Sequence, residues 1–142
     1  MRAILDVNIL LVLSDPEHEH YVRTQTWYSQ NAISGWASCP LTQNGFLRIR
    51  SQSRYVRPRP LAACFSRLSE WVSQSDHEFW PDDLSLLDSV HIDHSRILSQ
   101  RHLTDIYLLA LAVKHGGRLA TLDRGVPLAA VRSAGAERLV VV

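Results

Sequence analysis

The chain has 142 residues, of which 46% are hydrophobic and 20% charged, and its formal net charge is +1 at pH 7. This composition is that of an ordinary globular protein, and the length predicts one domain over residues 1–142 that buries about two-thirds of its unfolded surface. The sequence contains no apolar run near the roughly 20 residues of a membrane span and does not begin like a secretion signal. We therefore expect a cytoplasmic protein without membrane association, whose two cysteines are core thiols rather than a disulfide.

The chain opens with an apolar run and an acid. Residues 3–5 are typical of a strand buried on both faces of a parallel sheet. Asp6 follows at the carboxyl end of that strand, which is the edge where open α/β sheets bind their ligands. The alternative is that Asp6 or Asn8 only caps a helix starting near Ile9, and the sequence leaves both roles open.

Two helices are predicted on either side of a second strand at residues 36–39. Asp15 followed by Pro16 is a helix-start pattern, so we expect a helix from there to about residue 29, with Val22 and Trp27 inward. In the later helix, Thr42 is expected to be the N-cap, with Leu41 packed on Phe46 as a hydrophobic staple. Gln43 would then be its first helical residue, beside the same sheet edge as Asp6.

A basic segment without any acid follows. Its charged and aromatic side chains are Arg48, Arg50, Arg54, Tyr55, Arg57 and Arg59. Guanidinium groups beside a carboxylate site favour a track for an RNA phosphate backbone, and Tyr55 can stack on a base. The alternatives are a solvated basic face or a contact for an acidic protein partner.

The middle of the chain carries weaker signals. Residues 61–72 have the spacing of an amphipathic helix, and residues 78–80 predict a short third strand. Asp82 is expected to cap the next turn, and residues 95–101 to form another short helix.

Residues 102–125 are the most informative stretch. Thr104 is expected to cap a helix with Asp105 in its first turn, and the apolar residues after it predict a buried helix that ends at Gly116. A strand over residues 118–122 then ends at Asp123. About eleven helical residues rise about 16 Å and about six extended residues run back about 20 Å, so Asp123 should arrive near Asp105.

The end of the chain predicts a helix over residues 126–133 and a strand over residues 138–142. Strands alternating with helices predict an α/β fold: a three-layer α/β/α sandwich with a mostly parallel central sheet. Asp6, Asp105 and Asp123 then lie at one sheet edge. Clustered carboxylates repel one another and are stabilised by a hard divalent cation, Mg²⁺ or Mn²⁺, which supports phosphodiester hydrolysis.

Five segments together resemble the PIN-domain family, and within it the VapC-type toxin ribonucleases of bacterial toxin–antitoxin pairs. The segments are LDVN at 5–8, PLTQNGFLRI at 40–49, FWPDD at 79–83, LTD at 103–105 and ATLDRG at 120–125. They occur in the usual order and span nearly the whole chain. The resemblance implies a Mg²⁺-dependent endoribonuclease, with Mn²⁺ as an alternative ion, that acts on structured RNA such as tRNA or rRNA. It also implies a homodimer that a cognate antitoxin protein holds inactive.

The resemblance carries roles over to matching positions. The residues assigned to the site are the metal ligands Asp6, Asp105 and Asp123, the catalytic Gln43, and the supporting Asn8 and Thr121. Gln43 departs from the family, which most often has Glu there, because an amide is neutral and half of it is a hydrogen-bond donor. Either three acids suffice, or the site is degenerate or disabled. The alternative function is therefore a non-catalytic RNA- or protein-binding module that lost the metal site.

Overall fold

A parallel sheet lies at the centre of the computed structural model, which describes residues 1–142 apart from the side chain of Ala32. Within these residues the strands are β1 (Ala3–Leu5), β2 (Trp36–Ser38), β3 (His77–Phe79), β4 (Arg118–Thr121) and β5 (Leu139–Val141). All neighbouring strands pair in parallel, in the order β3-β2-β1-β4-β5. Each predicted strand is present, with bounds shifted by no more than one residue.

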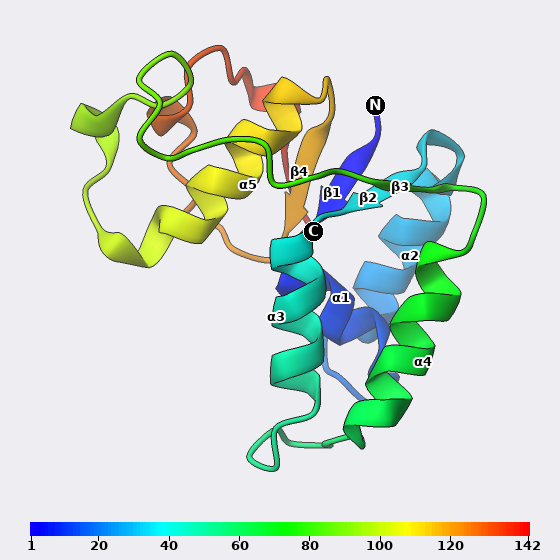
Figure 1. Cartoon of the computed structure of the whole chain (residues 1–142). Coiled ribbons are helices and arrows are strands. Elements are labelled where there is room, and N and C mark those ends of the chain that lie inside the picture. The colour runs from blue at the N-terminus through cyan, green and yellow to red at the C-terminus, as the bar shows by residue number, and fades with distance from the viewer.

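The two faces of the sheet are covered by different helices (Figure 1). The helices are α1 (Val7–Leu13), α2 (Tyr21–Asn31), α3 (Pro40–Arg50), α4 (Leu61–Val72) and α5 (Leu103–Lys114). Ile4 and Leu119 pack in the core formed with α5, whereas Leu5 and Ala120 pack in the core formed with the other four helices. Strand side chains alternate between faces, so a three-residue strand serves both cores. This arrangement confirms the predicted three-layer α/β/α fold.

Helix α5 is buried around most of its circumference, as its continuous apolar sequence predicts. Leu108, Leu109 and Leu111 are all fully buried. The helix is followed by Gly116, whose φ of 71° is the left-handed conformation that glycine adopts without a steric penalty. Among the described residues, no helix is long and apolar enough to cross a membrane.

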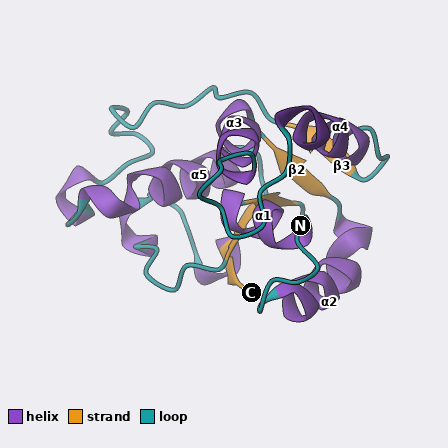
Figure 2. Ribbon diagram, turned by 90° about the horizontal axis from the view of Figure 1, so that it is seen from below, coloured by secondary structure: helices purple, strands orange, loops and turns teal.

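The connections diverge at the centre of the sheet. The chain passes from β1 to β2 through α1 and α2 on one face, and from β3 to β4 through α5 on the other (Figure 2). Strands β1 and β4 are neighbours, so the carboxyl ends of these two strands flank a topological switch point. Open α/β sheets bind their ligands at such a point.

The predicted helix start at Asp15 is wrong. Residues 16–20 form turns, α2 begins at Tyr21, and Val22 is 76% exposed rather than buried. The reason is a distant partner: Arg57 binds both carboxylate oxygens of Asp15, at 2.7 and 2.6 Å. The Asp15 carboxylate therefore binds the loop that follows α3 and does not cap a helix.

The start of α3 also differs from the prediction. Its N-cap is Cys39, and Thr42 is its third residue, with a hydroxyl that accepts from the Cys39 amide at 3.0 Å. Gln43 is therefore the fourth helical residue and not the first. Leu41 lies on the surface beside Leu84 instead of in the core that holds Phe46, so the predicted staple is wrong.

Four further local predictions are wrong, two of them helix caps and two of them short helices. Helix α5 begins at Leu103, with His102 rather than Thr104 as its N-cap. Residues 95–101 and 126–133 contain only short 3₁₀ turns, and in the second segment Val131 forms an antiparallel bridge with Ile92. Asp82 accepts hydrogen bonds from the Leu41 amide (3.1 Å) and the Tyr107 hydroxyl (2.9 Å), and so ties α3 to α5.

The Asp15–Arg57 pair gives a test of stability. We expect Arg57→Ala to lower the free energy of unfolding by about 2–3 kcal/mol, because it leaves a buried carboxylate without its cation. Urea unfolding measures the change. The matched control is Arg54→Ala, whose exposed guanidinium bonds only to Gln52 among the described residues and should change stability by no more than about 0.5 kcal/mol. Similar small losses in both variants would contradict a structural role for the pair.

Candidate functional site

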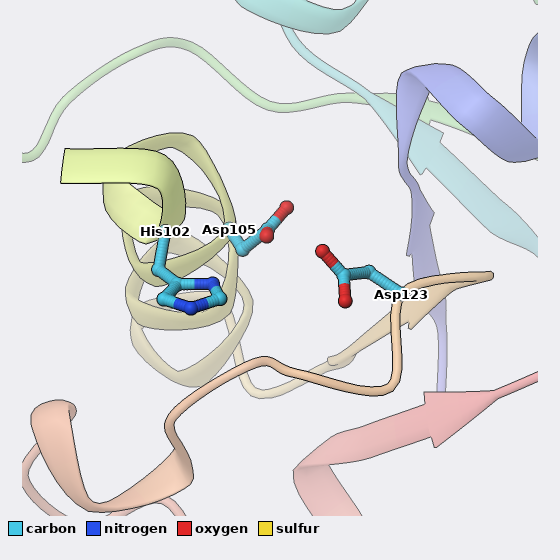
Figure 3. Close-up of side chains that lie close together, drawn as sticks. All are labelled: His102, Asp105 and Asp123. Carbon is cyan, nitrogen blue, oxygen red and sulfur yellow. The ribbon is translucent and has the colours of Figure 1, made fainter. Parts of the chain in front are cut away.

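Two acids that are distant in sequence meet at the carboxyl edge of the sheet. Asp105 is the third residue of α5, and Asp123 follows β4. Together with His102 they offer one ligand atom each, and these three atoms all lie within 4.8 Å of one another (Figure 3). The return of β4 toward the start of α5 thus brings together the two aspartates that the sequence pattern pairs.

Asp6 caps a helix and also lies at the carboxyl edge of the sheet. It caps α1, since its Oδ1 accepts a hydrogen bond from the Val7 amide at 2.7 Å. Its other oxygen accepts from the Thr121 hydroxyl at 2.6 Å, and the residue is only 6% exposed. Asp6 is therefore fixed at the switch point between β1 and β4, on the side where Asp123 lies.

Thr121 and Asn8, the two predicted supporting residues, orient this corner. The Thr121 hydroxyl donates to Asp6 and accepts from the Asn8 side-chain amide and the Asp123 backbone amide, both at 3.1 Å. The Asn8 side-chain oxygen Oδ1 in turn accepts from the Leu122 backbone amide at 3.2 Å. All the hydrogen-bonding capacity of the buried threonine hydroxyl is used, which holds the end of β4 against the start of α1.

Burial and mutual repulsion make the carboxyl groups hard to ionise together. Desolvation, with the charges of Asp6 and Asp123 added, raises the pKa of Asp105 to about 7. Burial also raises the pKa of Asp6, against the opposing hydrogen bonds from Thr121 and Val7, and the Asp123 charge raises it further. A bound divalent cation would favour the ionised form of every member of such a group.

Gln43 occupies the end of the neighbouring strand. Its side-chain nitrogen donates to the Ser38 hydroxyl at 2.9 Å, and that hydroxyl shares a hydrogen bond of 2.8 Å with His77. The amide is thus held at the carboxyl end of β2. Being neutral, it adds no charge to the repulsion among the aspartates.

The basic segment is divided between surface and interior. Arg48 and Arg54 are exposed. Arg50 is only 2% exposed, bonds to the Ser14 hydroxyl and the Arg57 carbonyl, and lies over the Tyr55 ring at 4.8 Å. Burial therefore removes Arg50 from the predicted RNA-binding surface, whereas Arg57 pairs with Asp15 and keeps 34% of its side chain exposed.

His102 is the residue that the sequence interpretation missed. It directly precedes α5, one helical turn before Asp105, and its ring lies beside the two carboxylates (Figure 3). The signal that could have found it is this spacing of three residues, which places two side chains on the same face of a helical segment.

Comparison with known proteins identifies close relatives. The chain is 46% identical over 139 residues to Ribonuclease VapC44 of Mycobacterium tuberculosis, covering 98% of each protein. It is 40% identical over 126 residues to Ribonuclease VapC38 of the same species, covering 87% of this chain and 86% of that protein. No protein-family model matches the chain.

One solved structure has a similar fold. It is the crystal structure of VapBC2 from Rickettsia felis bound to a DNA fragment from their promoter, and the matching chain has a TM-score of 0.57 at 14% sequence identity. The match covers 88% of this chain and 90% of that one. At this identity the likeness supports the fold class alone.

The raised pKa of Asp105 predicts how metal-free stability depends on pH. The unfolded chain releases this proton near pH 3.8, whereas the folded chain holds it until about pH 7. The free energy of unfolding should therefore fall between about pH 4 and pH 7, by roughly 2–4 kcal/mol, and Asp105→Asn should remove this fall. Urea unfolding in EDTA measures it, with Glu19→Gln, at an exposed acid, as the control. Parallel pH profiles for the parent and Asp105→Asn would refute the assignment.

Proposed function

Because the chain belongs to the VapC family of ribonucleases, we propose that it cuts structured RNA, tRNA or rRNA, with a divalent cation held by Asp6, Asp105 and Asp123. Family membership makes the chain an endoribonuclease of the toxin class in a toxin–antitoxin pair. The ion, the RNA class and the residue roles are the proposed part. The observation that supports them most is the convergence of buried carboxyl groups at the switch point of the sheet.

The donor set fits a hard cation. Carboxylate oxygens are the protein ligands that Mg²⁺ and Mn²⁺ accept, and the raised pKa of Asp105 is the electrostatic sign of a site that lacks a positive charge. A cation bound there lowers the pKa of a water molecule and stabilises negative charge on phosphate oxygens. Thr121, which Asn8 supports, holds the Asp6 side chain and the Asp123 backbone in place, so that this corner of the site is ordered before the substrate binds.

In this proposal Gln43 acts as a neutral polar group where most of the family has a fourth acid. Its hydrogen bond to Ser38 fixes the amide at the end of β2, so the side chain is ordered without a metal contact. The cation is then bound by the carboxylates of Asp6, Asp105 and Asp123. The rival proposal is a binding module with a degenerate site, and measured cleavage by the purified chain distinguishes the two.

The RNA backbone is proposed to follow the exposed arginines of the basic segment. Arg48 lies on α3, whose first turn is at the sheet edge and whose length is about 16 Å. Arg54 and Arg59 lie on the loop after that helix and are also exposed. A row of positive charges over this distance spans a few nucleotides. Its contacts with phosphate groups would add affinity for RNA without sequence specificity.

The proposed assembly is that of the family. The similar solved structure is a toxin–antitoxin complex bound to promoter DNA. We therefore expect a cognate antitoxin protein that inhibits this chain, and a cytoplasmic homodimer when the antitoxin is removed. Co-purification of the two proteins from their operon, followed by light scattering, tests both expectations.

The first functional test concerns the cation. Asp6→Asn, Asp105→Asn and Asp123→Asn should each reduce the cleavage rate by at least about a hundredfold, because each removes a negatively charged ligand. EDTA should abolish cleavage by the parent, and added Mg²⁺ or Mn²⁺ should restore it. The control is Asp76→Asn. Asp76 directly precedes β3, at the opposite, amino-terminal edge of the sheet, and its carboxylate accepts from the Tyr28 hydroxyl. Full activity after exhaustive chelation would refute the metal-dependent mechanism.

A second test concerns the basic segment. Arg48→Ala and Arg54→Ala should each weaken RNA binding and lower the slope of log affinity against log salt by about one, for one lost phosphate contact. Filter binding in the inactive Asp105→Asn background measures the slope without cleavage. Arg23→Ala, at an exposed position on α2, should leave the slope unchanged. An unchanged slope in all three variants would assign these arginines to solvent or to a protein partner.

A further inference from the structure

His102 adds a nitrogen donor to the oxygen donors of the proposed cation site. We propose that its imidazole binds the same ion, and that the site therefore prefers Mn²⁺ to Mg²⁺. This inference rests on the proposed metal-dependent function and goes beyond it, since three carboxylates alone give no reason for a choice between the two ions.

The spacing of the donor atoms fits one ion. Ligands of Mg²⁺ or Mn²⁺ lie about 2.1 Å from the metal, so two ligands on opposite sides of it are about 4.2 Å apart. The donor atoms of His102, Asp105 and Asp123 lie within 4.8 Å of one another before any ion draws them together. A closure of a few tenths of an ångström brings all three into contact with a single cation.

The imidazole has an unused hydrogen-bonding atom. Its Nδ1 is buried and has no hydrogen-bond partner within the part of the chain that the structure describes. A buried polar atom left unpaired costs about 1–3 kcal/mol, so native structures rarely retain one without a reason. Figure 3 shows the ring beside the carboxylates of Asp105 and Asp123, with a nitrogen on the edge toward them. A bound cation would satisfy this nitrogen.

The position of the ring is fixed from two sides. His102 ends a 3₁₀ turn capped by Ser99, whose carbonyl accepts the His102 amide at 3.3 Å. On the other side is Gly125, where a Cβ would lie 3.2 Å from the ring carbon Cε1 and 3.3 Å from Asp123 Oδ1. Glycine therefore makes room for the ring next to the acid. An imidazole confined in this way loses little conformational entropy on binding an ion.

The identity of the donor decides the preferred ion. Imidazole suits transition-metal ions, whereas carboxylates and water suit Mg²⁺ and Mn²⁺ alike. Mn²⁺ therefore accepts the whole set of side chains, and Mg²⁺ accepts only the oxygen part of it. Removal of the imidazole should weaken Mn²⁺ binding far more than Mg²⁺ binding.

Isothermal titration of the purified chain with MnCl₂ and with MgCl₂ tests this difference. We expect the parent to bind Mn²⁺ at least about tenfold more tightly than Mg²⁺. His102→Ala should weaken Mn²⁺ binding by about tenfold or more and change Mg²⁺ binding by less than about threefold. His102→Asn, which keeps a polar side chain, is the second variant should the first fail to fold. The matched control is His94→Ala, which removes an exposed imidazole elsewhere and should change neither affinity.

A spectroscopic readout separates a bound ligand from a structural role. Electron spin-echo modulation from ¹⁴N should appear for Mn²⁺ on the parent and on His94→Ala, and vanish in His102→Ala. If Mn²⁺ binds all variants equally and no nitrogen modulation appears, His102 is not a ligand, while the carboxylate site stands. If the parent binds neither ion, the proposed metal-dependent function itself fails, and with it this inference.

Discussion

The 2.6 Å hydrogen bond from the Thr121 hydroxyl to Asp6 is the contact on which the site depends. It joins the ends of β1 and β4, the neighbouring strands that flank the topological switch point. The same threonine binds the Asp123 amide, and the same aspartate begins α1. One buried hydroxyl therefore sets the spacing of two carboxylates and the direction of a helix. Loss of its donor or acceptor capacity would disturb fold and site together.

Much of the architecture could be predicted because it follows from length and periodicity. The apolar strand runs and the nearly continuous apolar sequence of α5 each permit one arrangement, and the rise of a helix against the run of a strand brings Asp123 to Asp105. Helix starts could not be predicted in the same way. Asp15 has the pattern of a cap, but its carboxylate is taken by Arg57 from 42 positions along the chain. Local patterns do not reveal such partners.

The site residues show the same limit. Asp6 was identifiable from its place at a strand end and Thr121 from the family resemblance. His102 was missed although it stands three residues before Asp105, because the sequence does not indicate the 3₁₀ turn in which it lies. Arg50 looked like part of a solvent-facing basic track, since no acid lies near it in sequence. It is buried because its guanidinium serves Ser14 and the loop backbone. Charge counted along the chain is therefore a poor guide to charge at the surface.

At the proposed cation site, the pKa of about 7 at Asp105 would make metal binding an exchange reaction near neutral pH. Below that pH, a cation must displace a proton from this carboxyl group, so each unit of acidification weakens apparent metal affinity by up to about tenfold. Above it, the carboxylate is already ionised and the competition disappears. Proton and cation thus act as rival ligands of one side chain, and the fraction of molecules loaded with metal depends on their ratio rather than on metal concentration alone.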